Sequence, residues 1–216
     1  PFLLLAGYEP DFAWNLFAKT VLALAAEFEV SGLHWVHSIA MPVPHTRPIG
    51  TTVSGNRREL TVAHSVWRPR TQVPATAGHL LEFRFVERGD RAVGFVLLVP
   101  HYLAETENPD AVIAAAERLM ASTGLVLMLD AVQERREDYL TRVDEQVAGN
   151  DELQQMVHNL ERRYDAYMAG RNPDDDSYDE GGFSERDLPS ADELAAELER
   201  YLASRPSGDE DKPGRG

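Results

Sequence analysis

The order of apolar and polar positions predicts alternating strands and helices in the first part of the chain. The apolar run 2–7 stops at a glycine and predicts a short buried strand. Asp11 then fits a helix N-cap, and Gly32 ends the helix that follows. The apolar stripe of this helix consists of Phe17, Val21, Leu24 and Phe28. Residues 33–40 predict a second strand, and this β-α-β unit is typical of a right-handed crossover in a parallel sheet.

The stretch 75–99 is compatible with two structures. Its apolar positions alternate on both sides of Gly89-Asp90, and this pattern alone would allow a β-hairpin. The alternative is a helix over 75–88, ended by Gly89, and a strand over 92–99. Hydrophobic periodicity leaves both open.

Helical periodicity dominates the second half of the chain. Asn108 and Pro109 are typical of a helix start, and Gly124 is typical of its end. The predicted inner face of this helix consists of Val112, Ala115, Ala116 and Leu119. Two further helices, over 132–147 and 153–168, are separated by Gly149-Asn150, which predicts an antiparallel helical pair.

These elements divide the chain into five predicted parts. Residues 1–129 form an α/β core with a mostly parallel sheet, and residues 130–169 form a C-terminal helical arm. A flexible acidic linker over 170–189 follows. A capping box that begins at Ser190 starts a terminal helix over 190–203, before a disordered tail over 204–216. Because the first predicted strand begins at residue 2, we expect the core to lack an N-terminal part.

Composition narrows the classes of function. The 216 residues carry a formal net charge of −15, which disfavours binding to nucleic acid or to an anionic membrane. The absence of cysteine excludes disulfides, thiolate catalysis and cysteine-ligated zinc. No apolar run reaches the length of a membrane span, so we expect a cytosolic protein.

Two loops carry the candidate chemistry. The loop 41–48 follows the strand over 33–40, precedes another predicted strand over 49–54, and presents His45, Thr46 and Arg47 between prolines. His101 and Tyr102 follow the apolar run that ends at Pro100. Strand-end loops are where open α/β sheets bind ligands, and these side chains could hold a phosphate or a carboxylate. The structural alternative is that the prolines brace a crossover and Arg47 forms an internal ion pair.

Other chemical signatures are weak. Glu9, with Asp11, could form a carboxylate pair for acid–base work, and it is a further candidate ligand-binding residue. Glu105 and Glu107 near His101 lack metal-ligand spacing, so we expect no metal site. The chain has no glycine-rich phosphate loop, nucleophile elbow or zinc-protease motif. We therefore assign no catalytic residue and no cofactor.

Four collinear segments carry a family resemblance: residues 6–11, 42–48, 73–82 and 99–104. Their most unusual sequence motifs are PHTRP at 44–48 and VPHY at 99–102. In these segments the chain resembles the proteasome assembly chaperone 2 family in its bacterial branch. The resemblance implies a core related to nucleoside phosphorylases with a C-terminal helical appendage, and it favours the helix over 75–88. It also implies roughly a hundred further residues before Phe2.

The resemblance implies a function class and no reaction. Eukaryotic relatives of the family help to assemble proteasome α-rings, and the bacterial branch brings no established catalytic residues. The leading hypothesis is a non-catalytic protein-binding or assembly-chaperone-like module with protein partners, proteasome subunits among them, that also self-associates. The alternative is a small-molecule-binding protein or enzyme of nucleoside-phosphorylase type, with an anion at His45, Thr46, Arg47 and His101.

Overall fold

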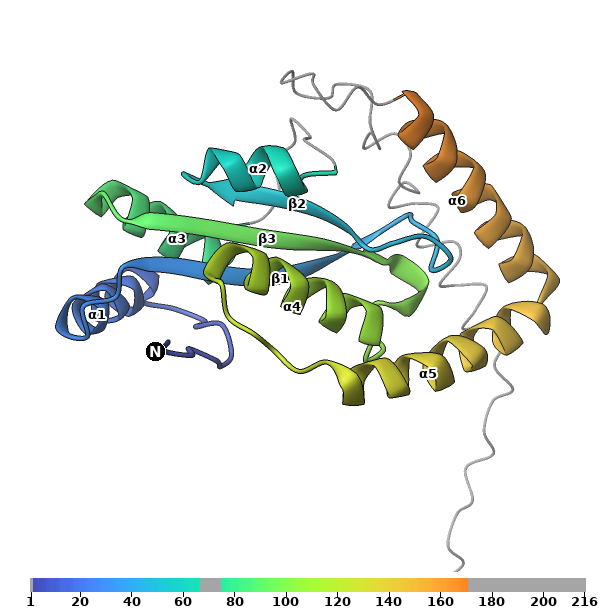
Figure 1. Cartoon of the computed structure of the whole chain (residues 1–216), viewed down its shortest axis with the longest axis horizontal. Helices are drawn as coiled ribbons and strands as arrows, with labels where there is room; N and C mark the ends of the chain where they lie inside the picture. Colours follow the sequence, from blue (N-terminus) through green and yellow to red (C-terminus); the bar gives the residue numbers. More distant parts are fainter. Residues whose placement is uncertain (1, 67–74, 171–216) are drawn as a thin grey trace, which may run out of the picture. The chain divides into compact units, whose positions relative to one another are not determined.

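The computed structural model describes residues 2–66 and 75–170 (Figure 1). All of them belong to one compact unit, whereas the predicted linker from residue 171 onward, the terminal helix and the tail lie outside the described residues. The elements in chain order are α1 (Trp14–Glu27), β1 (Gly32–Met41), β2 (Gly50–Gly55), α2 (Arg58–His64), α3 (Ala77–Arg88), β3 (Arg91–Pro100), η1 (His101–Leu103), α4 (Pro109–Thr123), α5 (Asp130–Ala148) and α6 (Asp151–Gly170).

The described strands form a sheet in the order β1-β3-β2. β3 pairs parallel with β1 and antiparallel with β2. Its sequence is apolar on both faces, as expected for a central strand covered by helices on either side, and nearly all of its residues are buried. The α/β class is confirmed. The described sheet is mixed, and the likeness to nucleoside phosphorylases stays a prediction.

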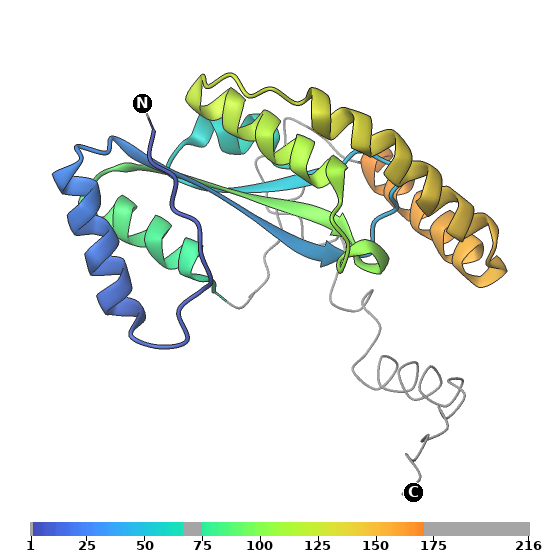
Figure 2. The same ribbon diagram turned by 90° about the horizontal axis from the view of Figure 1, so that it is seen from below.

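Helices cover both faces of the sheet. Figure 2 shows α1 and α3 on one face and α2 and α4 on the other. Ala25 of α1, Phe85 of α3 and Ala92 of β3 form a core cluster on the first face. On the second face, Leu60 of α2 packs with residues of β2 and β3, and Ala114 of α4 packs with Leu97 and Val99.

The indole of Trp35 occupies a narrow slot between β3 and α3. Glycines form both walls: a Cβ added at Gly94 would lie 2.6 Å from Cζ2 of Trp35, and one added at Gly78 would lie 2.6 Å from Cε3. Trp35 Nε1 donates to Glu82 (2.8 Å), which also accepts from Ser54 Oγ (2.7 Å). This partly buried network therefore ties α3 to β1 and β2.

The helix predicted after Asp11 forms as α1, but the strand predicted over 2–7 and both predicted ends of the helix are wrong. The segment 2–7 forms no strand, and the apolar side chains from Phe2 to Leu5 are 62–82% exposed. A strand needs a neighbour to satisfy its main chain, and among the described strands none pairs with this segment. α1 begins at Trp14 after Ala13 (φ 58°), without a side-chain cap from Asp11, and it ends at Glu27, well before Gly32.

The buried face of α1 also differs from the predicted stripe. The alanines Ala18 and Ala25 are buried, whereas Leu24 and Phe28 are 47% and 59% exposed. α1 packs on α3, and small side chains allow the two helices to approach closely. Val21 of the predicted stripe does pack against the core cluster with Ala25 and Phe85. The helix is apolar on more than one side, so periodicity alone predicted the buried face only in part.

The later elements follow the sequence more closely. α3 is a helix and not a hairpin strand, and it ends at Gly89 in the left-handed region (φ 91°). Asn108 caps α4 by accepting from the main-chain N–H of Asp110 (3.0 Å), and Gly124 ends it. Its inner face is centred on Ala114 and Ala116; Val112 is half exposed, so that part of the predicted face is wrong.

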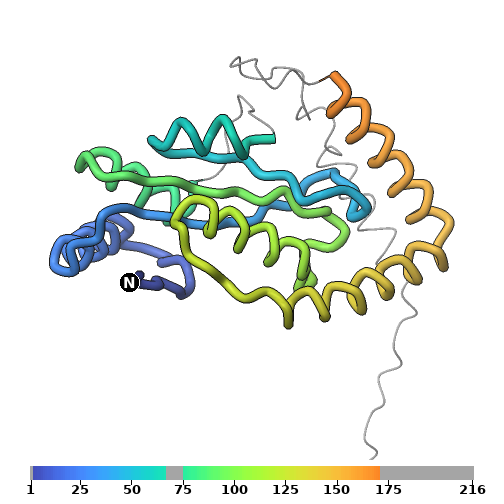
Figure 3. The backbone as a smooth tube through the Cα atoms, viewed as in Figure 1, coloured from blue at the N-terminus to red at the C-terminus, as the bar shows by residue number. Residues whose placement is uncertain are grey.

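α5 and α6 form an arm that extends from the core. Tyr139 and Val143 of α5 pack against Leu103. α6 buries Val157 and Leu160. The tube in Figure 3 follows the chain from α4 through α5 to α6, and the two arm helices diverge from the turn at 149–150 instead of packing side by side. The predicted antiparallel helical pair is therefore wrong. Among the described helices, none has the length and apolar character needed to cross a membrane.

Candidate functional site

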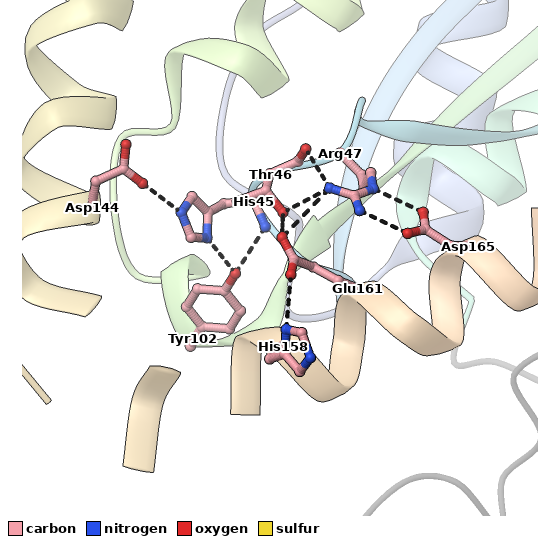
Figure 4. A network of polar contacts seen from close by, with 8 residues as sticks. All are labelled: His45, Thr46, Arg47, Tyr102, Asp144, His158, Glu161 and Asp165. Carbon is pink, nitrogen blue, oxygen red and sulfur yellow. Dashed lines mark hydrogen bonds and ion pairs between the residues drawn. The ribbon is translucent and has the colours of Figure 1, made fainter. Parts of the chain in front are cut away.

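The two predicted loops meet at one edge of the sheet. Met41 and Pro100 are register partners at the carboxyl ends of the parallel strands β1 and β3. The loop 42–48 and η1 leave from these ends, so they lie next to each other. The arm brings α5 and α6 to the same edge, and Figure 4 shows the resulting polar network.

His45 lies at the centre of the first half of this network. Its main-chain N–H donates to Tyr102 Oη (2.8 Å), and Nδ1 lies 2.7 Å from the same oxygen. Since Tyr102 Oη accepts from the main chain, its own hydrogen is available to Nδ1, and Nε2–H then donates to Asp144 Oδ1 (3.1 Å). Burial raises the pKa of Tyr102 to about 12, so its hydroxyl keeps this proton at neutral pH.

Arg47 and Thr46 form the second half. The Arg47 guanidinium binds Asp165 through two hydrogen bonds, Nε to Oδ1 (2.8 Å) and Nη2 to Oδ2 (2.7 Å). Thr46 Oγ1 donates to Glu161 Oε1 (2.6 Å), which also lies 3.5 Å from Arg47 Nη1. The hydrogen bond from Arg47 lowers the pKa of Asp165, and the same contact raises the pKa of Arg47.

The loop therefore directs its polar side chains at carboxylates of the same chain. We call the contacts of His45, Thr46 and Arg47 with Tyr102, Asp144, Glu161 and Asp165 the arm clamp. These contacts favour the interpretation that Arg47 forms an internal ion pair. An incoming phosphate or carboxylate would compete with Glu161 and Asp165 for Arg47, so the ligand-binding role of these residues stays a prediction.

Two candidate residues lie outside the arm clamp. His101 is exposed, and its ring stands edge-on to Tyr102 with the centroids 5.4 Å apart. Glu9 accepts from the main-chain N–H of Ala77 at the start of α3. A carboxylate is favourable at a helix N-terminus, where free N–H groups and the helix dipole attract negative charge. Glu9 thus contributes to the start of α3.

A cavity of about 790 Å³ adjoins the arm clamp. It lies between the loop at 45–49, one side of α4 and one side of α5. Arg136 and Asp110 form an ion pair within its lining. In the part of the chain that the structure describes, no group of three or more metal-binding side chains comes together.

The sequence pattern did not predict the acidic half of the arm clamp. Glu161 and Asp165 are four residues apart, a spacing that places two side chains on the same face of a helix. That spacing could have indicated an acidic face on α6. Nothing local pairs this face with a loop more than 110 positions earlier, as the contacts of Thr46 and Arg47 do.

Comparison with known proteins identifies the family. A model of the PAC2 family matches residues 1–147. The chain belongs to the PAC2 family. This membership confirms the family suggested by the PHTRP and VPHY motifs, both of which lie within the matched residues. A search of curated proteins finds no match.

Solved structures share the PAC2 fold of this chain. A Mycobacterium tuberculosis protein of unknown function is 40% identical, with 78% of this chain and 57% of that one covered and a TM-score of 0.75. A Corynebacterium glutamicum protein of unknown function is 32% identical over 79% of this chain and 64% of that one, also with a TM-score of 0.75. This chain thus spans less than two thirds of their lengths.

A third structure carries a functional description. The proteasome-assembly chaperone homologue of Mycobacterium tuberculosis has a TM-score of 0.63, with 70% of this chain and 64% of that one covered. It is 24% identical, and this level of similarity shows a shared fold.

Proposed function

We propose that this chain is a non-catalytic protein-binding module of the assembly-chaperone type, with proteasome-related partners. Membership of the PAC2 family and the fold shared with a proteasome-assembly chaperone homologue support a role in assembly. The observation that carries the non-catalytic part of the proposal is the arm clamp. Its polar side chains hold α6 against the loop, and Arg47, the cation of the loop, already binds Asp165 and Glu161.

Exposed apolar side chains support contact with further polypeptide. Leu16 of α1 is 66% exposed, and Val126 and Met128 between α4 and α5 are 89% and 87% exposed. Contact with a protein partner would bury these apolar side chains, which is favourable. The proposal includes self-association through such surfaces and a cytosolic location.

Affinity capture from a native lysate tests the proteasome-related partner. The tagged protein should recover proteasome subunits or assembly intermediates from wild-type cells and none from cells that lack the proteasome. Recovery of the same set of proteins from both lysates, or of no proteasome subunit at all, would contradict the proposal. Size-exclusion chromatography with light scattering tests self-association independently, since a monomer at all concentrations contradicts it.

The alternative of a small-molecule or anion site keeps one specific observation in its favour: His45, Thr46 and Arg47 line the cavity beside the arm clamp. Thermal-shift measurements with phosphate, nucleosides and nucleotides test it. A ligand present at about 100 times its dissociation constant adds about 2.7 kcal/mol to the free energy of unfolding. An unchanged melting temperature at millimolar ligand would exclude a site whose dissociation constant lies well below the ligand concentration.

A further inference from the structure

The cavity beside the arm clamp is a trough between two helical faces. Its volume of about 790 Å³ lies within the range of known ligand pockets. α4 and α5 pack against each other, and Figure 2 shows both helices on the same side of the sheet. Lining residues recur at helical spacing on each helix: Ile113 and Glu117 on α4, and Gln133, Glu137 and Leu140 on α5.

Some charges of the trough are already neutralised within the chain. Arg136 pairs with Asp110, Arg47 pairs with Asp165, and His45 contacts Asp144. Among residues 2–66 and 75–170, these contacts leave three charged side chains of the trough for other partners: two carboxylates, of Glu117 and Glu137, and one guanidinium, of Arg118.

Arg118 is poorly satisfied for a half-buried cation. Among the described residues its hydrogen-bond partner is Thr51, with Nε 3.4 Å from Oγ1. Thr51 itself is fully buried, so the guanidinium lies at the inner wall of the trough. The remaining N–H groups of a guanidinium are strong donors, and a main-chain carbonyl is a suitable acceptor for them.

We propose that the trough binds a short basic peptide segment of a partner protein. A lysine or arginine of the segment contacts Glu117 and Glu137, and a main-chain carbonyl accepts from Arg118. Apolar walls formed by Ile49, Ile113 and Leu140 accommodate a neighbouring apolar side chain. The two carboxylates outnumber the one guanidinium, and the chain as a whole carries a charge of −15, so charge complementarity favours a cationic segment.

This inference rests on the proposed protein-binding function and names the chemistry of the partner. The probes are fluorescein-labelled pools of short randomised peptides in which a central position is fixed as lysine, glutamine or glutamate. Fluorescence anisotropy with the full chain should give the highest affinity for the lysine pool and the lowest for the glutamate pool. The preference should shrink at about 0.5 M salt, because salt screens exposed charges.

Two variants with the same change in net charge decide whether the trough is responsible. The pair Glu117→Gln and Glu137→Gln should weaken binding of the lysine pool about fivefold, as expected for the loss of two exposed ion pairs. The control pair Glu134→Gln and Glu145→Gln alters exposed residues of α5 that do not line the trough. It should leave the affinity within about twofold of the original value. Arg118→Gln should weaken all three pools alike, because Arg118 contacts the main chain.

The peptide-binding and melting-temperature measurements each have an outcome that would overturn the inference. Equal affinity for the lysine and glutamate pools, or equal losses in the trough pair and the control pair, contradicts a basic-peptide site. A rise in melting temperature with phosphate or nucleotide, without peptide binding, assigns the trough to a small anion instead. If the lysine pool binds as described and affinity capture recovers no proteasome subunit, the trough stands and the proteasome-related role fails.

Discussion

At the scale of single residues, the arm clamp depends on groups that each satisfy more than one partner. Tyr102 Oη accepts from the main chain of His45 and reaches its ring nitrogen, and Arg47 binds both oxygens of Asp165. Such groups act as geometric constraints, because removing one atom leaves two others without a partner. Substitutions that remove single atoms therefore test the clamp most directly.

Tyr102→Phe removes one oxygen and preserves the ring. We expect the free energy of unfolding to fall by about 1–2 kcal/mol, because the half-buried N–H and Nδ1 of His45 lose their partner. Urea denaturation measures this change. Tyr8→Phe is the matched control, since Tyr8 is fully exposed and should tolerate the change. Equal stability of the two variants would contradict the role of Tyr102.

Arg47→Lys keeps the charge and removes the planar fork that binds both oxygens of Asp165. Hydrogen exchange should become severalfold faster at the amides of α6 around Glu161 and Asp165, while β3 keeps its protection. Arg135→Lys is the control, because the hydrogen bond of Arg135 within the described part of the chain is to the main-chain oxygen of Ala131 in its own helix (3.3 Å). Unchanged exchange in α6 of the Arg47 variant would show that other contacts hold the helix.

At the scale of elements, the Trp35 slot fixes how closely α3 approaches the sheet. Gly94→Ala would place a methyl group against the indole. Overpacking of this kind costs about 1–3 kcal/mol. Gly7→Ala is the control, since an added Cβ at Gly7 meets no atom within 4 Å. Urea denaturation compares the two variants, and equal stability would show that the slot can widen without strain.

Local patterns predicted the elements that carry their own start and end signals. Asn108, Pro109 and Gly124 define α4 without reference to any other segment, and the structure confirms them. The strand predicted over 2–7 is wrong because an apolar run forms a strand only where another strand pairs with it. The apolar face predicted for α1 differs from the buried one because the contact with α3 determines which side chains pack, and these are the small ones.

The candidate site also has one part that the sequence predicts and one part that it does not. Parallel pairing of β1 and β3 places the loops of His45 and Tyr102 at one edge, and the sequence predicts this placement. The acids that meet the loop lie 99 to 118 positions further along the chain. Their contacts depend on the path of α5 and α6 around the edge of the sheet, which local periodicity does not determine.

At the scale of the whole described unit, three histidines make stability depend on pH. Burial lowers the pKa of His34, His37 and His64 below the ordinary histidine value of 6.5, and Arg57, His79 and Arg118 respectively add to the effect. A group whose folded pKa is depressed favours the deprotonated form in the fold. Its contribution to stability is therefore present above pH 6.5 and is lost as the pH falls through the folded pKa.

We therefore expect stability to fall on acidification. The midpoint of urea denaturation should be lower at about pH 5.5 than at about pH 7.5. His64→Gln should make this dependence shallower, because one of the three groups no longer takes up a proton on unfolding. A midpoint that is constant, or that rises towards pH 5.5, would contradict the prediction.

The arm clamp also bears on the order in which the chain folds. Its contacts with α5 and α6 join residues separated by 99 to 118 positions, whereas α3 and β3 are neighbours along the chain. Closing such a long loop is entropically unfavourable until the intervening segments are compact. The sheet and its covering helices should therefore form first, and docking of α6 should be a separate, later phase. In a chain that emerges slowly from the ribosome, α6 would remain undocked until the rest of this unit had folded.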